Sequence, residues 1–146
     1  MSDMLRIEMP WPPMGLNPNA GLHWSKKHRL ITAYRAVGLS RAQDAMIGFE
    51  PLNPAGMLAV VITFYPPDRR HRDDDNMIAA FKAGRDGVAD GIGVNDRRFR
   101  PIYVVGLPRK PGMVIVEVPT NASGLPRAGE VEPYGTEPPP GWLSPY

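Results

Sequence analysis

The sequence predicts an α+β fold in which a small mixed β-sheet packs against two main helices. Short segments with a two-residue alternation or many β-branched residues indicate strands, and longer segments with apolar residues every three or four positions indicate helices. The predicted order along the chain is strand, helix, strand, helix, strand, strand. Mixed elements in this order are typical of a layered α+β or α/β domain.

Four segments have the pattern of β-strands. Apolar residues alternate with charged ones over residues 5–9, which predicts a half-buried strand, and an irregular Pro-rich loop over residues 10–24 follows it. Residues 57–65 are rich in β-branched and aromatic side chains, as in a buried strand. Residues 100–107 and 113–118 are predicted as two more strands, and the Pro- and Gly-containing turn between them predicts a hairpin.

Two longer segments have the pattern of helices. Ser25 is a candidate N-cap for a helix that extends to about residue 47. The apolar side of this helix is predicted to consist of Leu30, Ile31, Tyr34, Val37 and Leu39. A second helix is predicted over residues 75–89, with Gly91 and Gly93 ending it.

The composition excludes several classes of protein. The 146 residues and 16.1 kDa suit a single domain, and the formal net charge is +2. The absence of Cys excludes disulfides, thiolate metal sites and a cysteine nucleophile. No apolar run approaches the ~20 residues that span a bilayer. Charges at Asp3, Arg6 and Glu8 are atypical of a signal peptide, so we expect a soluble, cytoplasmic protein with no membrane partner.

The composition changes near residue 119. Residues 119–146 contain 7 of the 18 Pro, 4 of the 15 Gly and few β-branched side chains. Such a segment buries too little apolar surface to offset its ordering entropy, which predicts a disordered C-terminal tail. Trp142 and Tyr146 leave open a short docking motif at its end. We expect residues 1–118 to form one folded domain. Because only one basic and three acidic residues lie in the tail, this domain has a net charge of +4.

Three consecutive carboxylates, Asp73, Asp74 and Asp75, are the most informative feature of the sequence. Clustered carboxylates repel one another, so a structured cluster usually needs a cation, and oxygen ligands suit Mg²⁺ or Mn²⁺. In an extended segment, Asp73 and Asp75 would point to one side and Asp74 to the other. The alternative is that the three acids only cap the second helix and fill its first turn.

Other polar residues lie on the same side of the second predicted helix. Lys82 and Asp86 each lie about 20° from Asp75 on the helical wheel and form an i,i+4 pair. The alternative is a solvated helix face with a surface ion pair. Asp90 is expected to be a surface residue near the helix end. Asp96 either folds back to complete a site of three carboxylates or is an ordinary turn residue.

Basic residues surround these acids in the sequence. Arg69, Arg70 and Arg72 precede the carboxylates, and Arg97, Arg98 and Arg100 follow Asp96. Arginines of this number indicate a phosphate backbone as the partner. His71 is either a solvated loop residue or a phosphate contact. The basic side of the first helix, either solvated or part of the same nucleic-acid surface, comprises Lys26, Lys27, Arg29 and Arg35.

Taken together, these motifs resemble the RusA-type Holliday junction resolvases, small endonucleases common in phages and prophages. The matching features are the run from Arg72 to Asn76, a Lys and an Asp farther along the helix, and Asn95-Asp96 after a glycine turn. The resemblance covers roughly residues 5–118, with its specific motifs within 69–99.

The resemblance implies a RusA-like fold and specific roles for individual residues. It implies that Asp73, Asp75 and Asp96 are catalytic carboxylates around Mg²⁺, with Mn²⁺ as a substitute. Asn76 and Asp86 match residues that support the metal ligands rather than bind the metal. The sequence departs from the family where the usual catalytic Lys is replaced by Ala79. Lys82 lies about one turn farther along the same face, and we expect it to take that role.

The resemblance also implies an activity. The expected protein is a crossover junction endodeoxyribonuclease, in which a homodimer resolves four-way DNA by paired phosphodiester hydrolysis during recombination and repair. We expect this protein to act in the cytoplasm of a bacterium or of a phage-infected host. One alternative is a catalytically weak or inactive protein of the same fold that binds branched nucleic acid. Another is an interaction protein whose acidic cluster only caps a helix.

Overall fold

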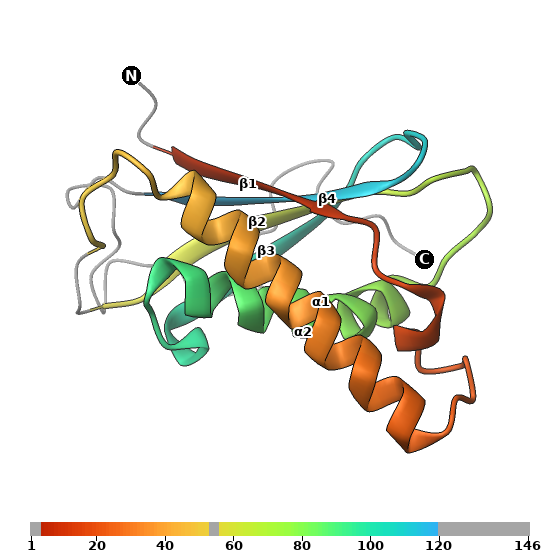
Figure 1. The fold of residues 1–146 in the computed structure, drawn as a ribbon. Coiled ribbons are helices and arrows are strands. Elements are labelled where there is room, and N and C mark those ends of the chain that lie inside the picture. The colour runs from red at the N-terminus through yellow and green to blue at the C-terminus, as the bar shows by residue number, and fades with distance from the viewer. Residues whose placement is uncertain (1–3, 53–55, 120–146) are drawn as a thin grey trace.

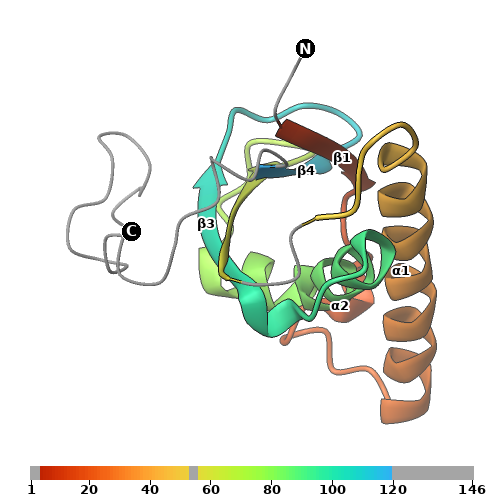
Figure 2. The same ribbon diagram turned by 90° about the vertical axis from the view of Figure 1, so that its left-hand side faces the viewer.

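Two long helices cover one face of a four-stranded sheet, which confirms the predicted α+β class (Figure 1, Figure 2). The computed structural model describes residues 4–52 and 56–119. The strands are β1 (Met4–Pro10), β2 (Leu58–Tyr65), β3 (Phe99–Val105) and β4 (Met113–Pro119). The helices are α1 (Trp24–Ala45) and α2 (Asp74–Ile92), with short 3-10 helices η1 (Met14–Leu16) and η2 (Asp96–Arg98).

The strands lie in the order β1-β4-β2-β3. β4 is antiparallel to both of its neighbours, whereas β2 and β3 are parallel and are joined through α2. The predicted hairpin between β3 and β4 is therefore wrong, because β2 lies between them. A Pro- and Gly-rich turn marks a change of direction but does not determine which strand the returning segment will pair with. Here β4 lies between β1 and β2 and pairs with both of them (Figure 1).

The hydrophobic core lies between the sheet and the helices, with Phe64 of β2 at its centre. The Phe64 ring packs edge-on against Phe81 of α2, with ring centroids 5.9 Å apart, and edge-on against Trp11 at 6.1 Å. Tyr103 of β3 stacks on the Phe64 ring, with ring centroids 6.1 Å apart. Each buried side chain of this size stabilises the fold by roughly 1.5–3 kcal/mol. This aromatic cluster joins two strands, one helix and the loop that follows β1.

The start of α1 differs from the prediction. α1 begins at Trp24 and its N-cap is His23 rather than Ser25. The Nδ1 atom of His23 accepts a hydrogen bond from the backbone N–H of Ser25 at 3.2 Å and lies 2.8 Å from the Ser25 hydroxyl oxygen. A hydroxyl is the commoner cap, but an imidazole nitrogen accepts the same backbone hydrogen bond.

The end of α2 also differs from the prediction. Gly93 ends the helix in the left-handed conformation, with φ of 77°, as expected. Gly91, however, lies inside α2. A Cβ at Gly91 would lie 2.5 Å from the Cβ of Ala42 in α1, so this glycine serves helix packing rather than helix termination.

Glycines let α1 and α2 cross at very close range. A Cβ at Gly38 of α1 would lie 2.6 Å from the carbonyl oxygen of Gly84, and a Cβ at Gly87 would overlap the carbonyl oxygen of Arg35. The buried residues of α1 are accordingly Tyr34, Gly38 and Ala42, whereas Ile31 of the predicted apolar side is 36% exposed. The narrow contact surface explains why most of α1 remains exposed.

The tail predicted over residues 119–146 begins at the end of β4. Apart from Pro119, the last residue of β4, the predicted tail lies outside the described residues. Among the helices of the described residues, none has the length and apolar character needed to span a membrane.

Replacing Gly87 with Ala is expected to force α1 and α2 apart and to lower the free energy of unfolding by ~1–3 kcal/mol. The loss should appear although Ala is a better helix former than Gly by ~1 kcal/mol. Urea denaturation measures it. Ser40→Ala, at an exposed position of α1, should change the same quantity by less than about 0.5 kcal/mol. Equal midpoints for the two variants would contradict the close crossing.

Candidate metal and nucleic-acid site

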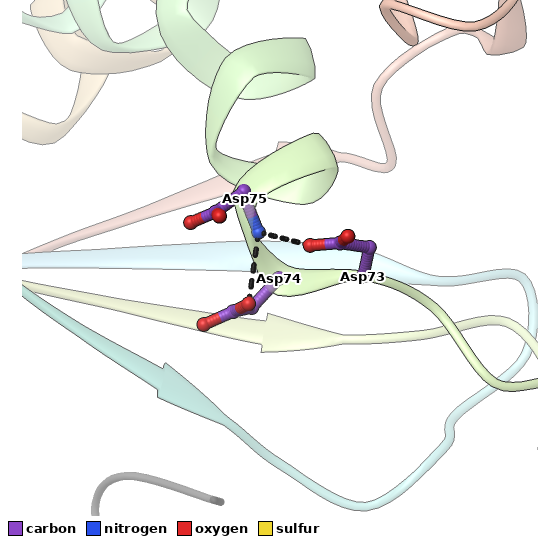
Figure 3. Close-up of side chains that lie close together, drawn as sticks. All are labelled: Asp73, Asp74 and Asp75. Atoms are coloured by element: carbon purple, nitrogen blue, oxygen red, sulfur yellow. Dashed lines mark hydrogen bonds between the residues drawn. The ribbon is translucent and has the colours of Figure 1, made fainter. Parts of the chain in front are cut away.

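The acidic cluster lies where the chain enters α2. β2 ends at Tyr65, and the following segment carries the chain to the N-cap Asp73. The Asp73 Oδ1 accepts a hydrogen bond from the backbone N–H of Asp75 at 2.9 Å, and the Asp74 Oδ1 accepts from the same N–H at 2.9 Å (Figure 3). Negative charge is favourable here because the first N–H groups of a helix carry partial positive charge. The capping role considered from the sequence is therefore present.

The three carboxylates nevertheless remain close enough to share a cation. One carboxylate oxygen from each of Asp73, Asp74 and Asp75 lies within 4.8 Å of the others, and the side chains of Asp73 and Asp75 are exposed. The expectation that Asp74 points away from the other two is wrong, because Asp74 is already part of the helix and the chain turns at Asp73 (Figure 3). Three carboxylates suit the oxygen preference of Mg²⁺.

An ion pair shapes the segment before the carboxylates. Arg72 approaches the Asp68 carboxylate at 2.8 Å, and its guanidinium lies over the Trp11 ring, 5.7 Å from the ring centroid. The hydrogen bond from Arg72 and one from the backbone N–H of Arg70 hold the pKa of Asp68 well below its usual range. The Arg72 side chain is only 19% exposed. Arg72 thus fixes the loop, and sequence reasoning missed Asp68 as its partner.

The other cations before the cluster face solvent. The Arg70 guanidinium is 3.3 Å from Asp68 but its side chain is 78% exposed. Arg69 and His71 are exposed, and neither forms an ion pair within the described part of the chain. Exposed guanidinium groups can bind phosphate oxygens without first breaking a buried contact.

A cleft of about 680 Å³ adjoins the carboxylates. One wall is the loop between β1 and α1, and the other is the segment that leads into α2 and the first turns of that helix. Asp73 and Asn76 line this cleft together with Trp11 and Met14. Sequence reasoning treated residues 10–24 as an irregular loop, compatible through its Pro-rich start and Asn17 with the N-terminal loop of RusA-type proteins, and did not place a cleft there.

Lys82 and Asp86 form the predicted i,i+4 ion pair on α2. The Lys82 Nζ lies 3.2 Å from Asp86 Oδ2, and the Lys82 side chain is 59% exposed. Lys82 follows Asp75 by seven residues, or about 10 Å along the helix axis. Its ammonium group therefore binds Asp86, one turn closer to the C-terminal end of α2, and not the acidic cluster at the start of the helix.

Asp96 lies at the opposite end of α2 from the acidic cluster. It begins η2, directly before β3, whose first residue Phe99 pairs with Leu58 at the start of β2. α2 has 19 residues and is about 28 Å long, so Asp96 does not fold back onto Asp73 within one chain. That expectation is wrong in this form, because the parallel crossover requires the helix to run the length of the sheet.

Three predicted phosphate-binding arginines lie at the same end as Asp96. Arg97 is exposed, whereas the Arg98 Nε donates to the carbonyl oxygen of Gly56 at 2.7 Å. Arg100 donates to the carbonyl oxygens of Arg97 and Phe99 at 3.2 and 3.1 Å. Arg98 and Arg100 therefore hold local backbone in place.

The basic side of α1 divides into two parts. Arg35 forms two hydrogen bonds with Asp90 of α2, at 2.7 and 3.1 Å, and Asp90 raises the pKa of Arg35 through them. Asp90 is thus a partner of α1 rather than only a surface residue. Lys26 and Lys27 lie at the start of α1, where the first turn contains no acidic residue. These two lysines, unlike Arg35, belong to no ion pair of the described residues.

Comparison with known proteins identifies one similar sequence but no family. No protein-family model matches the chain. A protein of Xylella fastidiosa (strain Temecula1 / ATCC 700964), named only "Uncharacterized protein", is 40% identical over 99 residues. The match covers 68% of this chain and 65% of that relative, so the chain spans less than two thirds of the relative's length. Fold and site geometry define the class, an α+β domain with an exposed acidic cluster beside a cleft.

Two substitutions at Asp73 separate capping from charge. Asp73→Ala removes the cap of α2 and is expected to lower the free energy of unfolding by ~0.5–2 kcal/mol. Asp73→Asn keeps an oxygen that accepts the Asp75 N–H, so it should cost only a few tenths of a kcal/mol. Thermal or urea unfolding without divalent metal measures both. Equal losses for the two variants would show that the cap is not what Asp73 contributes.

Proposed function

We propose that the protein is a Mg²⁺-dependent endonuclease of the RusA type that cuts four-way DNA junctions by paired phosphodiester hydrolysis in recombination and repair. The observation that carries the proposal is the triplet of Asp73, Asp74 and Asp75, two of them exposed, beside a cleft whose lining includes Arg70 and His71. Carboxylates this close to a DNA backbone would repel it unless a cation lay between them. The sequence resemblance to RusA-type resolvases supplies the reaction class.

In this proposal Asp73 and Asp75 hold Mg²⁺, or Mn²⁺ in its place, with Asp74 close enough to contribute an oxygen. When bound, such a metal makes a bound water more acidic and polarises a phosphate. The N-cap bond keeps the Asp73 carboxylate oriented, because its Oδ1 stays on the backbone N–H of Asp75 while Oδ2 remains available. Asn76, next to Asp75 and in the cleft lining, is placed to support these ligands. Asp86 lies eleven residues beyond Asp75, about 16 Å along the helix axis, and acts only on Lys82 through their ion pair.

The role of Asp96 in this proposal requires a homodimer. Within one chain it is separated from Asp73 by the length of α2. A two-fold axis perpendicular to α2 would relate two antiparallel copies of this helix and bring the end of one to the start of the other. We therefore assign Asp96 to the site of the partner subunit, so that each site contains carboxylates from both chains. Arg97, which is exposed beside Asp96, would accompany it.

Cations of the same proposal bind the DNA backbone. Arg69 and Arg70 lie directly before the carboxylates, and Lys26 and Lys27 extend the basic surface from the start of α1. Lys82, whose side chain is 59% exposed, reaches a phosphate after its ammonium leaves Asp86; i,i+4 ion pairs on helix surfaces typically contribute only ~0.3–0.5 kcal/mol. Arg72 acts indirectly by fixing the loop that carries its neighbours.

One observation favours a second candidate function. Lys82 pairs with Asp86, and the position of the usual catalytic Lys is Ala79. A protein with this arrangement could bind branched nucleic acid and cut it weakly or not at all. The two candidates differ in what the carboxylates do: they are required for cutting in the first and are dispensable for binding in the second.

Cleavage of a synthetic four-way junction distinguishes these candidates. We expect wild type with Mg²⁺ to cut two opposed strands, and Asp75→Asn to reduce the rate by at least about 100-fold, since one metal ligand loses its charge. Gel analysis of end-labelled strands measures the rate. Gln43→Asn, at an exposed position of α1, is the control and should cut like wild type.

Equal cutting by wild type and Asp75→Asn would remove the acidic cluster from the mechanism. Tight junction binding without metal and without cutting would instead favour the binding protein.

A mixed dimer tests whether the sites are shared between chains. Asp75→Asn and Asp96→Asn are each expected to be inactive, but differently tagged chains expressed together should regain nicking at about a quarter of the wild-type sites. Half of the randomly formed dimers are mixed, and each of these has one site with both carboxylates intact. If every site used residues of one chain, the mixture would stay as inactive as its parts.

A further inference from the structure

We propose that the cleft beside the carboxylates binds an unstacked nucleobase of the DNA strand being cut. This inference rests on the proposed function and adds a specificity site to it. The cleft lies between the loop after β1 and the first turns of α2 and has a volume of about 680 Å³. Pockets for small ligands commonly have ~300–1,000 Å³, so this cleft can accept one nucleotide unit.

The lining of the cleft has the chemistry that a base requires. Trp11, Met14 and Met77 contribute apolar surface, whereas Asn17 and Asn76 contribute amide groups. A nucleobase has two apolar faces and an edge of hydrogen-bond donors and acceptors. Apolar walls with a few amides therefore match a base better than they match a phosphate or a fully apolar ligand.

The cleft is formed before any ligand arrives, because the loop is anchored to the body at several points. The Tyr34 hydroxyl donates to the carbonyl oxygen of Pro10 at 2.6 Å, and burial raises the pKa of Tyr34, so this donor keeps its proton. Leu16 of η1 is 4% exposed. Gly15 packs against α1 so closely that a Cβ at this position would overlap the Leu30 side chain. Met14, between these anchors, is 85% exposed.

Charge around the cleft selects a nucleic acid as the source of the base. Arg70 and His71 line it on one side, and on the other side the loop leads into α1, where Lys26 and Lys27 follow the N-cap. Cations at the start of a helix are unfavourable with the helix dipole, and α1 has no acid in its first turn to compensate. A polyanion bound across this region would remove the conflict.

The cleft adjoins the acidic cluster, and this contact determines which nucleotide can place its base in the cleft. Asp73 lines the cleft and also belongs to the carboxylate triplet. A base held in the cleft therefore belongs to a nucleotide whose own backbone passes the carboxylates. In the open form of a four-way junction, a base at the crossover lacks a stacking neighbour on one face, so unstacking it is less costly there than in a duplex.

Abasic scanning of the junction tests the inference without requiring cleavage. Ca²⁺ replaces Mg²⁺, and equilibrium binding is measured for junctions in which one nucleotide near the crossover lacks its base. We expect one or two positions on the cut strands to lose about tenfold in affinity, as for the loss of one stacked base. Met14→Ala should reduce this penalty to less than about threefold.

Ile47→Ala is the matched control, because Ile47 is 78% exposed and lies beyond the other end of α1. This variant should keep the full abasic penalty. Both exposed side chains can be removed without loss of fold, which unchanged thermal midpoints verify.

The outcomes separate this inference from the proposed function. Flat abasic scanning, or a penalty that Met14→Ala leaves intact, overturns the base site, even if the junction is cut in Mg²⁺. A penalty relieved by Met14→Ala supports the base site, even if wild type fails to cut. A protein that neither binds nor cuts the junction overturns both.

Discussion

The close crossing of α1 and α2 determines the rest of the architecture. Glycines at the contact bring the two backbones together, so α1 needs little apolar surface to remain attached. Two adjacent residues of α1 at this contact add polar interactions: Arg35 forms an ion pair with Asp90, and the Tyr34 hydroxyl donates to the carbonyl oxygen of Pro10. Through Pro10, the crossing also fixes the start of the loop that forms one wall of the cleft. The position of the cleft relative to α2 is thus a consequence of helix packing.

The site combines structural and chemical demands in the same side chains. Asp73 caps α2 and orients its neighbours, and Arg72 stabilises the preceding loop through Asp68 and Trp11. Groups held in this way lose little conformational entropy when a ligand binds. Negative charge gathered at one point, with exposed cations around it, is the arrangement expected where a cation must neutralise carboxylates while the surroundings attract phosphate.

Sequence reasoning located the strands, the two helices and the acidic cluster because each depends on local pattern. The alternation at residues 5–9 and the i,i+4 spacing of Lys82 and Asp86 are properties of short segments. What it could not predict depends on distant contacts. The order of β3 and β4, the place of Gly91 inside α2 and the partner of Asp90 all follow from how the elements pack. The position of Asp96 required knowing that α2 spans the sheet.

The parallel connection through α2 gives the molecule a rigid spacer. One end of this helix carries the carboxylates and the other leads to η2, and β2 and β3 hold both ends to the same sheet. One inserted residue in α2 would turn everything beyond it by about 100° and shift it by ~1.5 Å, whereas an insertion in a loop need not disturb either end. Because the glycines also fix the helical phase against α1, evolution can lengthen the loops of this fold far more readily than α2.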